Sequence, residues 1–262
     1  MTIIITGTSS GIGFALAEYF GKKGHQVYGL SRKHTESRYF TSIPTDVTDN
    51  TAVQNAIAEV LKTETRIDIL INNAGMGMVG AVEDSTQEEI LKLFSLNLAG
   101  PVQMMTAVLP TMRQQKFGKI INVSSIGSEM GLPFRGFYSA SKSALDKVTE
   151  AMRYEVYPWN IEVCALHLGD IKTNIADNRV IARVSEPYTH IFNKVYALMN
   201  AHVDEGAEPE EVAEYIEKLL TKKTWKAHYY FGKFGQKIGV PLKWILPQGV
   251  YENLMKKYNK LD

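Results

Sequence analysis

The feature that most constrains the fold is a regular alternation of short apolar runs with segments whose apolar residues recur at helical spacing. The runs cover residues 3–6, 27–31, a short stretch near 43, 67–72, 119–123, 161–166 and 228–231. Between them lie amphipathic segments, such as the one that carries Val53, Ile57 and Val60. This alternation is typical of βαβ units, which form a parallel sheet covered by helices. The sequence therefore predicts a doubly wound α/β fold with about seven strands and helices on both faces.

Domain organisation follows from the absence of breaks along the chain. The 262 residues contain no linker, repeat or low-complexity tract. We expect a single domain over residues 1–262, with a substrate lid at about residues 170–205. Two helix ends are predicted from turn chemistry: a capping box at residues 85–88, and a break at Gly100 and Pro101. A third helix, with Tyr138 and Lys142, is expected to run until Pro158.

Composition excludes several classes of partner. With 45% hydrophobic and 22% charged residues, the chain is ordinary for a soluble protein. A net charge of +1 gives no reason to expect nucleic acid or an anionic membrane as the main partner. No segment reaches the roughly 20 apolar residues of a membrane span. Cys164 is the only cysteine, which excludes an intrachain disulfide and fits a reducing, cytoplasmic location without a signal peptide.

The first apolar run leads into a glycine-rich turn, Thr6-Gly7-Thr8-Ser9-Ser10-Gly11-Ile12-Gly13. Glycines in such a turn permit a tight bend, the approach of a pyrophosphate and close packing of helix on strand. Backbone N–H groups and the positive helix end then face the phosphates. An ordinary βα turn is the alternative. The position after a first strand favours a Rossmann-type nucleotide site.

The loop after the second run bears on which dinucleotide is bound. An acidic residue there would bind both ribose hydroxyls, whereas an arginine would pair with a 2′-phosphate. Here Ser31 takes the place of the acid, and Arg32 and Lys33 follow. This pattern favours NADP(H) over NAD(H), although a solvated basic loop would show the same pattern of residues.

Tyr138 and Lys142 are four positions apart and share one face of the predicted helix. Tyrosine has a pKa near 10 and is a poor base at neutral pH. An ammonium about 4 Å away, at an effective dielectric near 20, favours the phenolate by about 4 kcal/mol. We therefore expect Lys142 to bring the pKa of the phenol towards neutral pH, so that Tyr138 can act as acid and base.

Several motifs in the right order make the chain resemble the short-chain dehydrogenase/reductase family over residues 3 to about 173. They are the turn at Gly7, Gly11 and Gly13, the sequence Asn72-Asn73-Ala74-Gly75, and the pair Tyr138 and Lys142. Ser125 and Asn97 match the remaining active-site positions of the family. The resemblance implies a nicotinamide-dependent oxidoreductase that interconverts a carbonyl and an alcohol.

The resemblance also implies roles for the catalytic residues. Ser125 would hydrogen-bond the substrate oxygen, Tyr138 would transfer the proton, and Lys142 would hold the ribose of the nicotinamide. Asn97 would anchor a water that links Lys142 to solvent, and Asp46 and Val47 would contact the adenine. With the turn, the implied cofactor residues are Gly7, Ser9, Ser10, Gly11, Ile12, Gly13, Ser31, Arg32, Asp46, Val47, Asn73, Ala74, Gly75, Tyr138, Lys142, Gly169, Ile171 and Thr173.

One segment departs from the family pattern. After the sixth run the family has Pro-Gly, whereas this chain has Leu168 before Gly169. The change puts the rigidity of this loop in doubt.

Substrate and assembly are expected from the flanking segments and the resemblance. Apolar residues around 76–79, 130–137 and 175–203 suggest a lipophilic ketone, aldehyde or alcohol, or merely a packed lid or a subunit contact. The six histidines look scattered, so no metal is expected. The resemblance implies a homodimer or homotetramer. The alternative functions are an NADP(H) sensor without turnover and an epimerase-like enzyme. The amphipathic C-terminal segment would pack on the protein or a partner, or touch a membrane surface.

Overall fold

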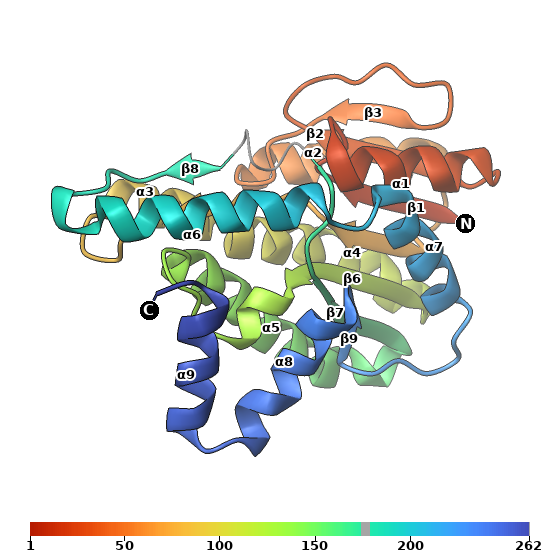
Figure 1. Ribbon diagram of the computed structural model, residues 1–262. Coiled ribbons are helices and arrows are strands. Elements are labelled where there is room, and N and C mark those ends of the chain that lie inside the picture. The colour runs from red at the N-terminus through yellow and green to blue at the C-terminus, as the bar shows by residue number, and fades with distance from the viewer. Residues whose placement is uncertain (174–178, 262) are drawn as a thin grey trace.

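The computed structural model describes residues 1–173 and 179–261 of the chain. Its main feature is a seven-stranded sheet in the order β3-β2-β1-β4-β6-β7-β9, in which every pairing is parallel (Figure 1). The strands are β1 (Thr2–Thr6), β2 (Gln26–Ser31), β3 (Thr41–Pro44), β4 (Ile69–Asn72), β6 (Gly118–Ser125), β7 (Ile161–Leu168) and β9 (His228–Phe231). The chain winds outward from β1 to β3, then returns to β4 on the other side of β1. The predicted fold class is confirmed, and the point of reversal between β1 and β4 is where such folds bind ligands.

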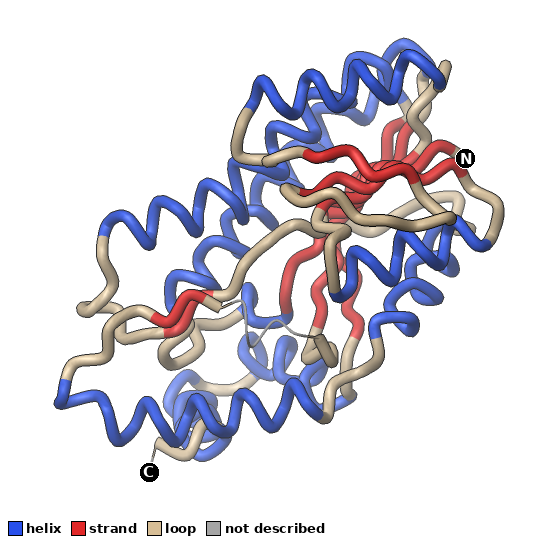
Figure 2. Tube along the Cα trace, turned by 90° about the horizontal axis from the view of Figure 1, so that it is seen from above, coloured by secondary structure: helices blue, strands red, loops and turns tan. Residues whose placement is uncertain are grey.

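Helices cover both faces of this sheet (Figure 2). Successive side chains of a strand point to opposite faces, so in β1 Ile3 and Ile5 belong to one core cluster and Ile4 to the other. The first cluster is closed by α1 (Gly11–Lys22) and α7 (Pro209–Leu220), and the second by α2 (Asn50–Thr63), α4 (Gly100–Gln115) and α5 (Gly136–Val156). Cys164 lies fully buried in the first cluster, where burial raises the pKa of its thiol.

The helix before β6 differs from the expectation. The prediction that Gly100 and Pro101 break it is wrong, because α3 (Gln87–Phe94) continues through a π-helical turn at Ser95–Ala99 into α4. The wider turn accommodates a proline that cannot donate to a carbonyl four residues earlier. The capping box lies one residue later than predicted, with Thr86 as N-cap and Glu89 as its partner. Among the described residues, Gln87–Gln115 is one helix long and apolar enough to cross a membrane, but half of its apolar window is buried in the protein.

The remaining elements surround the carboxyl edge of the sheet. Helix α6 (Glu186–Asp204) crosses this edge, and β8 (Val180–Ile181) pairs with β5 (Met78–Val79) beside it (Figure 1). They belong to the expected lid, of which residues 174–178 lie outside the described part. The C-terminal segment forms two helices, α8 (Phe234–Ile245) and α9 (Gln248–Tyr258), joined at Pro247. Helix α5 ends before Pro158, as predicted, and leads into a 3₁₀ turn at Tyr157–Trp159.

Candidate active site

A cleft of about 820 Å³ opens at the carboxyl ends of the central strands. Its lining combines the glycine turn, the ends of β2, β4 and β6, the start of α5 and the loop after β7. Of the predicted site residues, those in the lining are Gly7, Ser9, Ser10, Gly11, Ile12, Ser31, Arg32, Asp46, Val47, Asn73, Ala74, Gly75, Ser125, Tyr138, Lys142, Gly169, Ile171 and Thr173. Gly13 and Asn97 are buried directly behind this lining.

The glycine turn has the geometry of a phosphate cradle. Gly7 and Gly11 have φ angles of 76° and 57°, which disfavour any side chain. A Cβ on Gly13 would stand 2.2 Å from the carbonyl oxygen of Gly7, so the helix can approach the turn only with glycine here. The Thr6 hydroxyl accepts from the N–H groups of Asn73 and Ala74 at 3.0 and 2.9 Å. The turn is thus fixed to the end of β4, and it fits the pyrophosphate of a dinucleotide.

Charges at the outer end of the cleft surround the predicted ribose and adenine positions. Arg32 is exposed, whereas the Ser31 hydroxyl is buried and donates to the carbonyl of Lys33 at 2.7 Å. The Asp46 carboxylate accepts from the side chain and the N–H of Thr48, and these bonds lower its pKa, with a smaller contribution from Arg32. The Asp46 carboxylate is therefore a fixed hydrogen-bond acceptor close to the exposed guanidinium of Arg32.

Asn97 is held in the π-helical turn by a complete set of hydrogen bonds. Its carboxamide accepts from Met76 N–H at 2.9 Å and donates to the Met76 carbonyl and to Ser141. A Cβ on Gly75 would lie 3.2 Å from Asn97 Oδ1 and 3.3 Å from Lys142 Nζ. The structure therefore brings Asn97, Gly75 and Lys142 together at the end of β4.

Lys142 is a buried cation at the base of the cleft. Its ammonium donates to the carbonyl of Val123 at 2.8 Å, and only 5% of the side chain surface is exposed. Burial lowers the pKa of Lys142 to about 8, and the negative charge of Asp146 opposes this shift. The lysine can thus gain or lose a proton near physiological pH.

The pKa of Tyr138 does not shift in the expected direction. Burial raises the pKa of the Tyr138 phenol, so the prediction that Lys142 brings this pKa towards neutral is wrong. The groups that oppose burial are Ser125, by hydrogen bonding, and the guanidinium charges of Arg135 and Arg179. Tyr138 is therefore a neutral phenol, poised to donate a proton.

Ser125 ends β6 and presents its hydroxyl to the cleft. Its Oγ accepts from the N–H of Gly127 at 3.0 Å, which fixes the side chain beside Tyr138. Ser124 points to the opposite face of the strand and is buried. This alternation supports the choice of Ser125 over its neighbour.

The loop after β7 is held firmly despite the departure at Leu168. Leu168 belongs to the buried core, and Gly169 N–H donates to the carbonyl of Phe231 at 2.7 Å. A Cβ on Gly169 would stand 2.2 Å from Gln236 Oε1, so α8 packs directly against this loop. Contacts with β9 and α8 thus replace the rigidity that proline would supply.

Two sets of residues in or behind the cleft were missed in the sequence. Arg135 and Arg179 line it together with Asp170, and their charges act on Tyr138. His167 and His228 lie behind Ser125 and are hydrogen-bonded to each other, so the six histidines are not all scattered as predicted. His167 could have been suspected from its place in an apolar strand, but its partner is 61 residues away.

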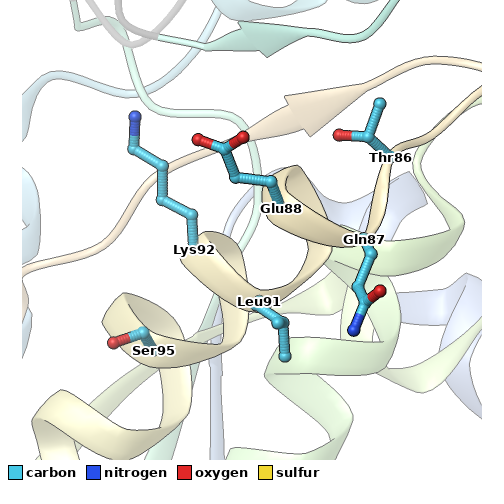
Figure 3. Close-up of a pocket in the computed structure, with 6 residues that line it drawn as sticks. All are labelled: Thr86, Gln87, Glu88, Leu91, Lys92 and Ser95. Carbon is cyan, nitrogen blue, oxygen red and sulfur yellow. The ribbon is translucent and has the colours of Figure 1, made fainter.

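A shallow hollow lies over α3 and the start of the π-helical turn, next to the cleft (Figure 3). Its six residues are Thr86, Gln87, Glu88, Leu91, Lys92 and Ser95. Lys92 and Ser95 also line the cleft, but none of the predicted site residues lines the hollow. The Leu91 side chain is 60% exposed, so the hollow is a surface feature beside the candidate active site.

Comparisons with known proteins agree with the geometry of the cleft. Residues 1–183 match the family model described as short chain dehydrogenase. A 3-ketodihydrosphingosine reductase from Bacteroides thetaiotaomicron is 38% identical over 97% of this chain and 96% of its own length. A probable short-chain type dehydrogenase/reductase, VdlC, from Helicobacter pylori is 32% identical over the same shares. The crystal structure of a short-chain dehydrogenase from Streptomyces avermitilis matches with a TM-score of 0.83 and 26% identity, over 99% of this chain and 96% of that one.

The family model covers most of the chain, and both relatives span nearly its full length. The chain therefore belongs to the short-chain dehydrogenase/reductase family of nicotinamide-dependent oxidoreductases.

Proposed function

We propose that this protein reduces a lipophilic ketone to a secondary alcohol with NADPH, using Tyr138 as the proton donor. The observation that carries the proposal is the convergence of Asn97, Ser125, Tyr138 and Lys142 on one cleft that also contains a phosphate cradle. These residues come from three different elements, and surface positions would have no reason to meet in this way.

The chemistry of the chain's own residues follows from their placement. The bound dinucleotide would supply or accept the hydride at the carbonyl carbon. The Ser125 hydroxyl donates to the substrate oxygen and stabilises the negative charge that develops there. Tyr138 is protonated, because burial raises its pKa, and gives its proton to this oxygen. Lys142 would hold the ribose hydroxyls of the dinucleotide and can return a proton to the site, since its pKa is about 8.

An apolar wall on the substrate side of the cleft supports a lipophilic substrate. Its members come from β5, the segment after β6, α6 and α9, and they are Met78, Val79, Met130, Leu132, Met199, Val203 and Met255. The Bacteroides relative is named a 3-ketodihydrosphingosine reductase, and the match covers 97% of this chain and 96% of the relative. We infer a ketone with a flexible hydrocarbon chain, because methionines adapt to such ligands.

The assignment is tested with Tyr138→Phe. The variant should bind NADPH as tightly as the parent and reduce a long-chain 3-ketone at least about 100-fold more slowly, because it lacks the proton donor. NADPH binding is followed by fluorescence titration and turnover by loss of the reduced nicotinamide. Undiminished turnover would refute the proposed function. Tight binding of NADPH with no turnover of any ketone or alcohol by the parent would favour the sensor.

The preference for NADPH is tested separately at Arg32. We expect Arg32→Ala to raise the Kd for NADPH about tenfold or more and to leave the Kd for NADH nearly unchanged, since only NADPH carries the 2′-phosphate. Lys33→Ala is the matched control at the next exposed cation. Equal losses for both dinucleotides in the Arg32 variant would contradict phosphate recognition.

Assembly and location complete the proposal. We infer a homodimer or homotetramer that is assembled through the exposed faces of the helices on either side of β6, and a cytoplasmic enzyme. Tyr154 and Tyr157, which are 79% and 81% exposed at the end of α5, and Leu91 on α3 support this surface.

A further inference from the structure

A chain of polar side chains runs from the protein surface to the back of Ser125. Glu150 Oε1 lies 3.0 Å from His228 Nε2, His228 Nδ1 lies 2.9 Å from His167 Nε2, and His167 Nδ1 lies 3.2 Å from the carbonyl oxygen of Ser125. Glu150 and His228 are partly exposed, whereas His167 is fully buried. The three contacts form one path through the protein.

The positions of the two histidines are fixed by the sheet. Strand register places His167 of β7 opposite Ser124 of β6 on one side and Tyr230 of β9 on the other. The Tyr230 ring stacks on the His167 ring with centroids 4.6 Å apart. The strand register and the stacked Tyr230 ring thus hold the His167 ring on the path.

Counting protons shows that neutral rings cannot make all of these contacts. The Ser128 hydroxyl lies 3.1 Å from His167 Nδ1 and donates to the Ser125 carbonyl at 2.7 Å. The path from Glu150 through both rings and Ser128 to Ser125 therefore has four contacts, and each needs one proton. Two neutral imidazoles and one hydroxyl carry three protons, so the observed set of contacts requires one more.

We propose that His167 and His228 share one added proton and that this pair positions Ser125 for the reaction. The inference rests on the proposed function, in which Ser125 stabilises the substrate oxygen. In the protonated pair, His228 donates from both nitrogens and His167 donates from Nδ1 to the Ser125 carbonyl. When the proton leaves, His228 keeps a proton on Nε2 for Glu150, and His167 must donate from Nε2. Its Nδ1 lone pair then accepts from the Ser128 hydroxyl, which gives up its bond to the Ser125 carbonyl, so both contacts of that carbonyl are lost.

The charged groups around the pair favour the added proton. From α5, the Asp146 carboxylate lies 3.9 Å from His167 Nδ1, and from the turn after β6 Glu129 lies 3.8 Å from the same atom. Burial lowers the pKa of the inner ring, His167, whereas the outer ring, His228, is partly exposed and lies 3.0 Å from the Glu150 carboxylate. Glu150, which contacts His228, also forms an ion pair with Lys147. Lys147 and His228 lower the pKa of Glu150, although burial has the opposite effect.

The same cluster carries less support for a metal ion. Glu129, His167 and His228 place possible ligand atoms within 4.8 Å of one another. However, the facing ring nitrogens are joined by a 2.9 Å hydrogen bond, and Glu129 Oε1 accepts from the Tyr230 hydroxyl at 2.7 Å. The described contacts use these atoms for a proton network.

The first test is spectroscopic and needs no substrate. Long-range ¹H–¹⁵N spectra of the histidine rings of the full chain are recorded between about pH 5.5 and 9, the range in which histidine titrates. We expect His167 to carry its proton on Nδ1 at low pH and on Nε2 at high pH, changing in the same step in which His228 loses its charge. A proton on Nε2 of His167 at every pH would overturn the proposal. Spectra that change on addition of EDTA would also overturn it, because a metal would then hold the pair.

The second test uses turnover of the ketone. In His228→Asn a side-chain amide can donate to His167 without titrating, so the variant should keep the low-pH activity. It should lack the decline that we expect in the parent when the pair gives up its added proton. His228→Phe should lower kcat about tenfold at all pH values, the size of one lost hydrogen bond, with the Kd for NADPH unchanged. The matched control is His25→Asn, which replaces a half-buried histidine next to the start of β2. Equal pH profiles for the parent and His228→Asn would overturn the inference. Absence of turnover in the parent would count against the proposed function, and the spectra alone would then decide whether the histidine pair shares a proton.

Discussion

At the scale of single residues, the buried charge of Lys142 weakens the fold. Its folded-state pKa of about 8 lies below the ordinary value for lysine, so the folded chain binds this proton less tightly than the unfolded chain. The cost to stability is therefore fully present at pH 7, and it is lost as the pH rises from about 8 to beyond 10. The full difference corresponds to about 3 kcal/mol.

We expect Lys142→Met to be more stable than the parent at pH 7 by about 1–2 kcal/mol, since the lost bond to Val123 offsets part of the gain. The advantage should shrink at pH 10, and turnover should be lost. Urea denaturation at the two pH values measures the effect. Lys147→Met, at an exposed position of the same helix, should change stability by less than about 0.5 kcal/mol. A less stable Lys142→Met at pH 7 would contradict the argument.

The residues that meet at the cleft could be predicted from the sequence because their spacing is local or belongs to a familiar order of motifs. What failed was their electrostatics. The pKa of Tyr138 depends on burial and on Arg135 and Arg179, and no spacing along the chain reveals which cations a cleft will bring to a phenol.

At the scale of elements, the close packing of α1 on the turn after β1 depends on the absence of a side chain at Gly13. A Cβ there would meet the Gly7 carbonyl oxygen at 2.2 Å and Asn73 Nδ2 at 2.5 Å, and the first of these is backbone. Gly13→Ala should therefore displace the turn, destabilise the protein by about 1–3 kcal/mol and weaken NADPH binding at least about tenfold. Thermal unfolding and fluorescence titration measure the two effects. Gly249→Ala, where a Cβ meets nothing within 4 Å, is the control and should leave both unchanged. Tight NADPH binding by Gly13→Ala would show that the cradle is not needed.

The elements were predicted well wherever one pattern dominated. Central strands buried on both faces read as continuous apolar runs, and all seven were expected near their observed positions. The short pair of β5 and β8 was not foreseen, because two residues carry no periodicity. Nor was the π-helical turn, since Gly100 and Pro101 are ordinarily signals for a helix end.

At the scale of the whole molecule, the outer surface of the long helices exposes large apolar side chains. Leu91 is 60% exposed on α3, and Tyr154 is 79% exposed at the far end of α5. If copies of the chain associate there, Leu91→Glu and Tyr154→Glu should each shift the protein towards the monomer, because a carboxylate would be buried in the contact. Light scattering after size-exclusion chromatography measures the mass. Val250→Glu on α9 is the control. An unchanged oligomer in both helix variants would place the contact elsewhere.

The hydrogen-bonded path behind Ser125 could not be predicted from the sequence for a similar reason. His167 and His228 meet only because β7 and β9 are neighbours in the sheet, and Glu150 reaches them from α5. Contacts of this kind depend on which strands pair, and a single sequence fixes the strands more readily than their neighbours.

The burial of Cys164 makes the protein convenient for fluorescence labelling. Its thiol is enclosed in the core and is held in the unreactive, protonated form. A cysteine introduced at an exposed point of α6, such as His190→Cys, would then be the sole site for a maleimide dye. Motion of that helix over the cleft could be watched in real time without first removing the native residue.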